Sequence, residues 1–189
     1  AVAAGLLRKG ASKRNASPPS RTFAVVVILM LSWVPGVGAT TYTYTSASPC
    51  TYNGNGFSQC CGTHDTIVID ATVTTIAARA FEDCDSVTSI DFSSATSLTT
   101  IAGSGFHHMD LLTTVDMSGA TALSSIGEFA FSLSPTLSSV KLASSITVID
   151  QFAFTETLLS TAASIDFNGV NCATATSAAA ANPPFDFAC

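Results

Sequence analysis

Hydrophobic residues in the middle of the chain recur at matched offsets, with a period of 23 to 25 residues. Each period contains a phenylalanine that follows Ala or Gly, with an isoleucine five positions before it. Self-similarity at a fixed period of this length is the signature of a repeat architecture. The positions that mark the period are Phe81, Phe106, Phe131 and Phe154, with Ile76, Ile101, Ile126 and Ile149.

Short segments between these phenylalanines alternate polar and apolar residues. The pattern occurs at 89–93, 114–118, 139–143 and 164–168. Such alternation predicts a strand with one buried face. A unit of about 24 residues cannot bury its apolar face alone, so the units should stack and share a core, with the four phenylalanines as its spine. At most a turn or two of helix is expected around the segments from each isoleucine to its phenylalanine.

The outward positions of these strands predict one polar sheet face. Stacked strands lie about 4.8 Å apart, so Asp91 and Asp116 should be neighbours, with Lys141 between Asp116 and Asp166. Two interpretations stay open: a solvated surface on which Lys141 relieves repulsion, or a ligand-binding surface. Ala143 is expected on the same face. The candidate ligand-facing residues are Ser89, Asp91, Ser93, Thr114, Asp116, Ser118, Ser139, Lys141, Ser164, Asp166 and Asn168.

The segments that flank the repeats contain most of the cysteines. Residues 40–65 are rich in Thr, Ser, Gly and Asn and predict an N-terminal cap, because the end of a repeat array must be covered. Residues 171–189 are Ala-rich and predict a C-terminal cap or a linker. Cys84 occupies a repeat position, where we expect a buried thiol. The other five cysteines are an odd number. One of them must therefore be free, be paired with Cys84 or be paired outside the chain. These disulfide candidates are Cys50, Cys60, Cys61, Cys172 and Cys189.

The first 39 residues have the pattern of a secretory signal peptide. Five basic residues precede a twelve-residue apolar run at 23–34, and small residues at Val37 and Ala39 suit a cleavage site. The run is short for a transmembrane helix, which needs roughly 20 apolar residues. We therefore expect a secreted or cell-surface protein that begins near Thr40 and meets the membrane only through its signal segment.

Charge and motifs exclude several functions. Residues 40–189 contain two basic residues, Arg79 and Lys141, against all thirteen acidic ones, for a net charge of −11. Such a surface repels phosphate backbones, which excludes nucleic acid as a partner. The pair His107–His108 is expected in an exposed turn, with no third ligand at metal-site spacing. We predict no catalytic residue, no metal site and no cofactor, because no catalytic motif is present.

The repeat also resembles a known family. The pattern Ile76-x-x-x-Ala80-Phe81, followed by Cys84 and by Val-Thr-Ser-Ile-Asp-Phe at 87–92, resembles the BspA-like leucine-rich repeat family. The shorter link at 142–149 is similar to the form usual in that family, and the resemblance extends roughly over residues 66–170. The chain departs from the pattern where the family often has Cys, at Met109, Ser134 and Thr157.

The resemblance implies both an architecture and a class of function. It implies a right-handed leucine-rich-repeat solenoid of about four to five repeats in residues 66–170. A small parallel sheet should form one face, with irregular turns or short helices on the other. It further implies adhesion or recognition rather than catalysis. Our leading hypothesis is a secreted or cell-surface module that binds a protein or glycan through its polar sheet face. The alternative is a structural protein of an extracellular matrix or wall without a specific ligand.

Overall fold

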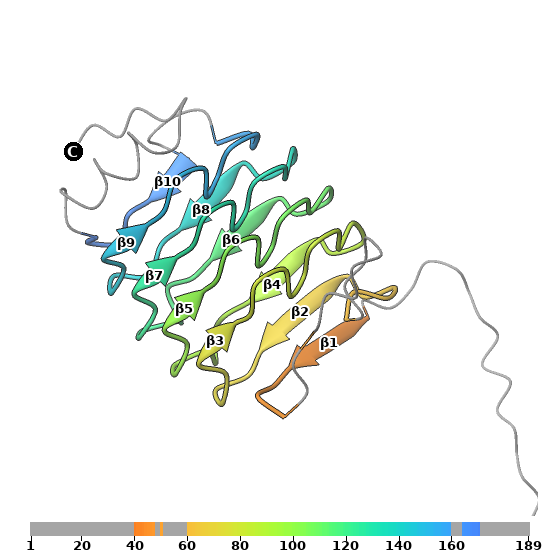
Figure 1. Ribbon diagram of the computed structural model, residues 1–189, viewed down its shortest axis with the longest axis horizontal. Coiled ribbons are helices and arrows are strands. Elements are labelled where there is room, and N and C mark those ends of the chain that lie inside the picture. The colour runs from red at the N-terminus through yellow and green to blue at the C-terminus, as the bar shows by residue number, and fades with distance from the viewer. Residues whose placement is uncertain (1–39, 48–49, 51–59, 160–163, 171–189) are drawn as a thin grey trace, which may run out of the picture. The chain divides into compact units, whose positions relative to one another are not determined.

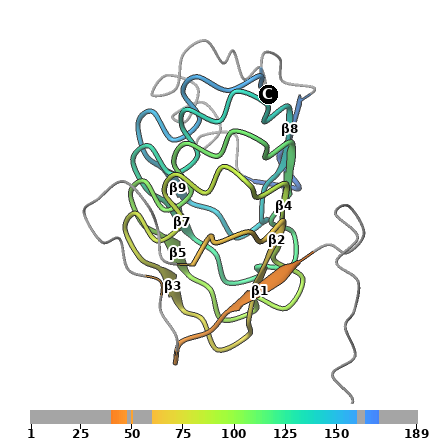
Figure 2. The same cartoon turned by 90° about the vertical axis from the view of Figure 1, so that its right-hand side faces the viewer.

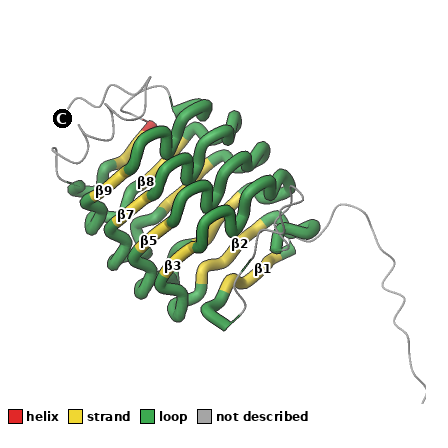
Figure 3. The backbone as a smooth tube through the Cα atoms, in the orientation of Figure 1, coloured by secondary structure: helices red, strands yellow, loops and turns green. Residues whose placement is uncertain are grey.

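The computed structural model describes residues 40–47, 50, 60–159 and 164–170, so the predicted signal segment (1–39) and C-terminal segment (171–189) lie outside the described residues. Within the described part, the chain winds into successive coils that stack from β1 and β2 to β10 (Figure 1). The coils consist of short strands joined by turns (Figure 3). No helix among the described residues is long and apolar enough to cross a membrane.

The first sheet is parallel and has the strand order β1-β2-β4-β6-β8-β10. The apolar residues at its centre, such as Ile90, Val115 and Val140, are buried, as the alternating pattern predicts. The fold prediction of a small parallel sheet is therefore confirmed. Its strands are β1 (Thr41–Tyr44), β2 (Thr66–Ile69), β4 (Ser89–Asp91), β6 (Thr114–Asp116), β8 (Ser139–Lys141) and β10 (Ile165–Asp166).

A second parallel sheet, which the sequence did not reveal, follows another side of the coil (Figure 2). Each of its strands has two residues and ends at the isoleucine that precedes a spine phenylalanine by five positions. Two residues are too few for an alternating pattern to be detected, although the isoleucines themselves are buried. The strands are β3 (Thr75–Ile76), β5 (Thr100–Ile101), β7 (Ser125–Ile126) and β9 (Val148–Ile149).

The segments around the phenylalanines form a third ladder between repeats, made of turns and not of strands. The N–H groups of Arg79, Phe81 and Asp83 donate to carbonyls of the next repeat, at 3.2, 2.9 and 3.1 Å. The intervening N–H groups of Ala80 and Glu82 close turns onto carbonyls three residues earlier. Within this ladder, the donors between repeats all point toward the later repeat. The same bonds are made by Ser104, Phe106 and His108, and again by Phe129, Phe131 and Leu133.

The four spine phenylalanines stack inside these turns. Successive ring centroids lie 5.1, 5.2 and 5.4 Å apart, and the planes are parallel to within 14°. Phe131 is fully buried between Phe106 and Phe154. At the first end of the stack, the ring of Tyr44 packs edge-on against Phe81 at 5.2 Å. The spine therefore forms a continuous core from β1 to the fourth phenylalanine.

Links from the first sheet to the second come in two lengths, which correct one prediction. In the long link after β4, the N–H of Leu98 donates to the carbonyl of Ala95, at 3.1 Å. In the short link after β8, the N–H of Ile146 donates to the carbonyl of Ala143, at 3.2 Å. Ala143 therefore corresponds to Ala95 and is fully buried, whereas the alternating pattern placed it on the outward face. The short link omits the two residues that would occupy that face.

Gly119 lies in a long link that stacks on the long link of the preceding repeat. The backbone of that preceding link approaches Gly119 closely. A Cβ atom at this position would lie 2.6 Å from the carbonyl oxygen of Phe92 and 2.7 Å from the Cα of Ser93. Gly119→Ala should therefore lower the free energy of unfolding by about 1–3 kcal/mol, the range for overpacking. Urea denaturation followed by circular dichroism measures this loss.

The matched control is Ser94→Ala, at the equivalent position one repeat earlier. Ser94 is exposed. The link of the preceding repeat, on which Ser94 would otherwise stack, is the short form. Its change should stay within about 0.5 kcal/mol, as is usual for surface substitutions. Equal stability of Gly119→Ala and Ser94→Ala would contradict the close approach of the two long links.

The described cysteines form two disulfides, and one prediction about them is wrong. Cys50 pairs with Cys60 and Cys61 pairs with Cys84, with Cα atoms 5.6 and 5.1 Å apart. Cys84 is therefore not the expected buried thiol, because the cap places Cys61 against the first repeat. The remaining candidates, Cys172 and Cys189, lie outside the described residues.

Candidate binding surface

Charged side chains form one column across the outward face of the first sheet. Asp91 is the register partner of Asp116, which pairs with Lys141, which in turn pairs with Asp166. The three aspartates are exposed and Lys141 is partly exposed. In the first repeat the column begins with Val68, the register partner of Asp91. The column thus presents one lysine among three carboxylates.

Hydroxyl side chains form a second column beside the first. The hydroxyls of Thr66 and Ser89 are hydrogen-bonded at 2.9 Å, and Thr114 is the register partner of Ser139. Ser164, which precedes β10, is partly buried. The predicted face residues of β4, β6 and β8 are therefore adjacent in register. Their role in binding stays a prediction.

Each aspartate of the column also stabilises the turn that begins the link after its strand. Asp91 Oδ1 accepts the N–H of Ser93 at 2.8 Å, and Asp166 Oδ1 accepts the N–H of Asn168 at 2.9 Å. Asp116 Oδ1 accepts both the N–H and the hydroxyl of Ser118, at 2.9 and 2.5 Å. Asp commonly bonds the backbone two residues onward in this way. One oxygen of each carboxylate is therefore held in place by the fold.

The pKa of Asp116 reflects this environment. Partial burial pushes it upward, but the hydrogen bonds from Ser118 and the charge of Lys141 outweigh that effect, so the pKa is lowered. Lys141 Nζ lies 3.9 Å from Asp116 Oδ2. An exposed ion pair of this kind contributes little to stability. Asp116 therefore stays ionised at neutral pH, with its second oxygen at the surface.

An open depression of about 480 Å³ lies between the ends of β4 and β6. Its polar lining consists of Asp91, Ser93, Asp116 and Ser118, and Gly119 contributes backbone. The depression offers carboxylate and hydroxyl oxygens to a donor group. In the described part of the chain, no group of three or more His, Cys, Asp or Glu side chains is arranged to hold a metal ion.

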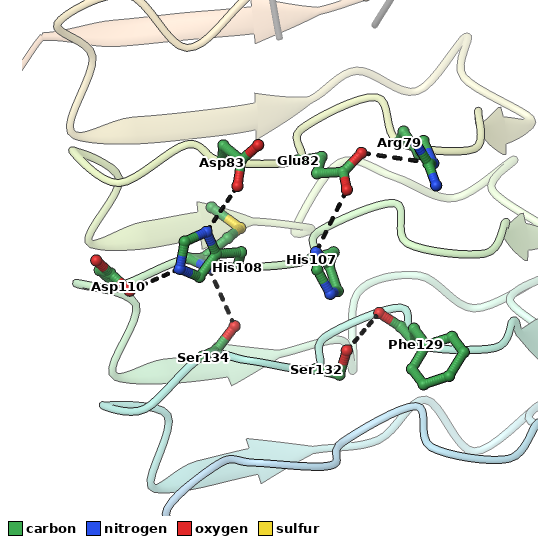
Figure 4. A network of polar contacts seen from close by, with 10 residues as sticks. Arg79, Glu82, Asp83, His107, His108, Asp110, Phe129, Ser132 and Ser134 are labelled. Atoms are coloured by element: carbon green, nitrogen blue, oxygen red, sulfur yellow. Dashed lines mark hydrogen bonds and ion pairs between the residues drawn. The ribbon is translucent and has the colours of Figure 1, made fainter. Parts of the chain in front are cut away.

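A second polar cluster lies in the turns that follow the spine phenylalanines, and sequence reasoning underestimated it (Figure 4). The turn of His107 and His108 was predicted to be exposed, but both side chains are partly buried. At the positions equivalent to His107, Glu82 is only 8% exposed and Ser132 only 2%. They are covered because the ladder between repeats packs each turn against the next. The residue type immediately after each phenylalanine contains no signal of this burial, since Glu82, His107 and Ser132 are all polar.

Both histidines of this cluster pair with carboxylates of the first repeat. His108 Nδ1 lies 2.6 Å from Asp83 Oδ1, in hydrogen-bond geometry. His107 Nδ1 lies 3.5 Å from Glu82 Oε1, a contact without hydrogen-bond geometry. Glu82 Oε2 in turn lies 3.5 Å from Arg79 Nε. The cluster thus joins side chains of two successive repeats.

Comparison with known proteins gives one match. The model of the BspA type leucine-rich repeat region matches residues 52–171, in six copies. No curated protein and no solved structure is significantly similar to the chain. The matched residues make up more than half of the 189-residue chain and include every strand from β2 to β10. The chain belongs to the BspA type leucine-rich repeat family.

Proposed function

We propose that this protein is a secreted or cell-surface recognition module that binds a protein or glycan through the polar face of its first sheet. The observation that supports the proposal is the charged column from Asp91 to Asp166, which lies in register across β4, β6, β8 and β10. Leucine-rich solenoids use extended faces of this kind for binding. The two disulfides fit an oxidising compartment.

The face is preorganised for such a role. The turn hydrogen bonds fix the carboxylates of Asp91 and Asp116, so little side-chain freedom is lost when a partner binds. Carboxylates and hydroxyls in adjacent columns accept hydrogen bonds from ammonium, guanidinium or sugar hydroxyl groups. The excess of acidic residues should also steer partners with a basic surface toward the protein.

One observation favours the alternative, a structural extracellular protein without a specific ligand. The aspartates of the column already have a local role, because each stabilises the turn after its strand. That role alone would explain why Asp stands at these three positions, while Lys141 precedes a short link. An experiment must therefore remove the charge and keep the turn.

The double variant Asp91→Asn, Asp116→Asn meets this requirement, because an Asn side-chain oxygen can accept the same N–H bonds. If the face binds, the variant should lose at least tenfold in affinity for an extracellular protein or glycan captured by the wild type, roughly 1.4 kcal/mol. Surface plasmon resonance at fixed salt measures the affinity, and circular dichroism verifies the fold.

The control variant is Glu128→Gln, which also removes a carboxylate but lies beyond the second sheet, where Glu128 accepts a hydrogen bond from Gln151. Its affinity should match that of the wild type. Undiminished binding by the folded double variant would reject the proposed face and favour the structural alternative.

A further inference from the structure

Turns of the first two repeats bring one imidazole into a group of carboxylates. We name residues 82–85 and 107–110 the charged corner. His108 Nδ1 contacts Asp83 Oδ1 of the first repeat at 2.6 Å, while its Nε2 lies 3.6 Å from Asp110 Oδ1 of its own repeat. The charge of Asp85 also acts on His108. His108 is therefore placed between carboxylates of both repeats (Figure 4).

The charged corner contains one end of a disulfide. Cys84 lies between Asp83 and Asp85 in the chain, is fully buried, and is bonded to Cys61 of the cap. The N–H of Asp83, the residue before Cys84, donates to the carbonyl of His107 at 3.1 Å, which holds the two turns together. Because Cys84 is fully buried and Cys61 is nearly so, a reductant reaches the sulfur atoms through local opening of the structure.

We propose that the charged corner is a proton-sensitive clamp, in which protonated His108 holds the first two repeats together and protects the Cys61–Cys84 disulfide. When His108 is charged, it neutralises part of the repulsion among Asp83, Asp85 and Asp110. When it is neutral, that repulsion favours separation of the turns. The clamp is distinct from the polar sheet face and does not depend on it.

The direction of the pH effect follows from His108. Its hydrogen bond with Asp83 raises its pKa above the usual value of 6.5, partial burial opposes the shift, and the charges of Asp110, Asp83 and Asp85 add to it. Because the pKa is raised in the closed state, the stabilisation is complete below about pH 6.5 and is lost as the pH rises through the raised value. The clamp therefore weakens on the alkaline side.

His107, on the other side of the corner, acts in the opposite direction. Burial lowers its pKa despite the nearby charge of Glu82, while the charges of His108 and Arg79 lower it further. Its contribution is present above about pH 6.5 and is lost as the pH falls through the lowered value. The third repeat adds only uncharged groups, the hydroxyls of Ser132 and Ser134. The corner should be tightest near the ordinary pKa of histidine.

The rate at which the phosphine reductant TCEP opens Cys61–Cys84 tests the clamp. Protein is treated between pH 6 and pH 9, free thiols are trapped, and each disulfide is quantified by mass spectrometry. The Cys50–Cys60 bond of the same molecule is the internal reference, which cancels the pH dependence of the reductant. The ratio of the Cys61–Cys84 reduction rate to the Cys50–Cys60 reduction rate should rise with pH. We expect a rise of roughly tenfold for each unit by which the pKa of His108 is raised.

Two variants identify the group that is responsible. In His108→Gln the ratio should stay at its high alkaline level at every pH, whereas His107→Gln should retain the alkaline rise. A wild-type ratio that does not change with pH would overturn the proposal, and so would a rise that persists in His108→Gln. If His108→Gln does not fold, Asp83→Asn replaces it. The pKa of His108, measured by NMR, should then return toward its usual value and the alkaline rise should shrink. An unchanged pKa in this variant would equally overturn the clamp.

Discussion

Phe131→Ala should lower the free energy of unfolding by about 3–5 kcal/mol, the range for removing a core phenylalanine. The ring is fully buried and stacked on both faces, with Phe106 at 5.2 Å and Phe154 at 5.4 Å. Its removal leaves a cavity in the middle of the spine, between the rings of Phe106 and Phe154. Small domains are stable by only about 5–15 kcal/mol, so the variant should be largely unfolded or insoluble at 37 °C. Thermal and urea denaturation measure the loss.

The same repeat offers a control of the same residue type. Phe129 is 38% exposed and stacks on a single ring, that of Phe152, at 5.3 Å. Phe129→Ala should cost about 0.5–1.5 kcal/mol, the value of one aromatic pair. Similar losses for Phe129→Ala and Phe131→Ala would show that the spine does not dominate the stability of the solenoid.

Removal of the Cys61–Cys84 disulfide should be the next most damaging change. The bond closes a sequence separation of 23 residues and ties the cap to the first repeat. The double variant Cys61→Ser, Cys84→Ala should lose about 2–4 kcal/mol, the typical contribution of a disulfide. Both cysteines are replaced so that no free thiol can exchange with other bonds. Urea denaturation under non-reducing conditions measures the loss.

The Cys50–Cys60 bond provides the comparison, because it closes a separation of only 10 residues within the cap. A shorter closed loop restricts the unfolded chain less, so removal of this bond should cost less. A larger loss from the Cys50–Cys60 pair would contradict the conclusion that the bond to the first repeat is the more important of the two.

The sequence predicted those parts of the fold that recur identically in every repeat. The offset from each isoleucine to its phenylalanine identified the spine, and the alternating pattern at Ile90, Val115 and Val140 identified the first sheet. The sequence revealed these features because the same type of residue occupies the same position in every repeat. The match of the family model over residues 52–171 confirms the family that the same residues suggested.

What the sequence did not reveal depends on contacts between repeats. The strands of the second sheet have two residues each, too few for a periodic signal, as at Thr75–Ile76. The partner of Cys84 depends on where the cap places Cys61, which no repeat pattern encodes. The position of Ala143 depends on link length, and the burial of Glu82 depends on how closely the turns of the ladder pack.

Left-handed backbone in the turns was equally hidden, because no glycine marks it. Arg79, Ser104, Phe129 and Phe152, two positions before the spine phenylalanines, have φ between 57° and 60°. The residues two positions after them are also left-handed, with φ between 55° and 60°. Such residues are uncommon outside glycine. The ladder between repeats holds this conformation, so local propensity does not predict it.

The uniform direction of that ladder has an electrical consequence. In an ordinary sheet the peptide dipoles of a strand alternate and nearly cancel. Here the N–H groups of Phe81, Phe106 and Phe131 all point toward the later repeat, as do those two residues before and after them. The peptide dipoles therefore add along the stacking direction, as they do in an α-helix. This side of the solenoid has a negative pole toward the first repeat and a positive pole toward the fourth, and each added repeat lengthens the dipole.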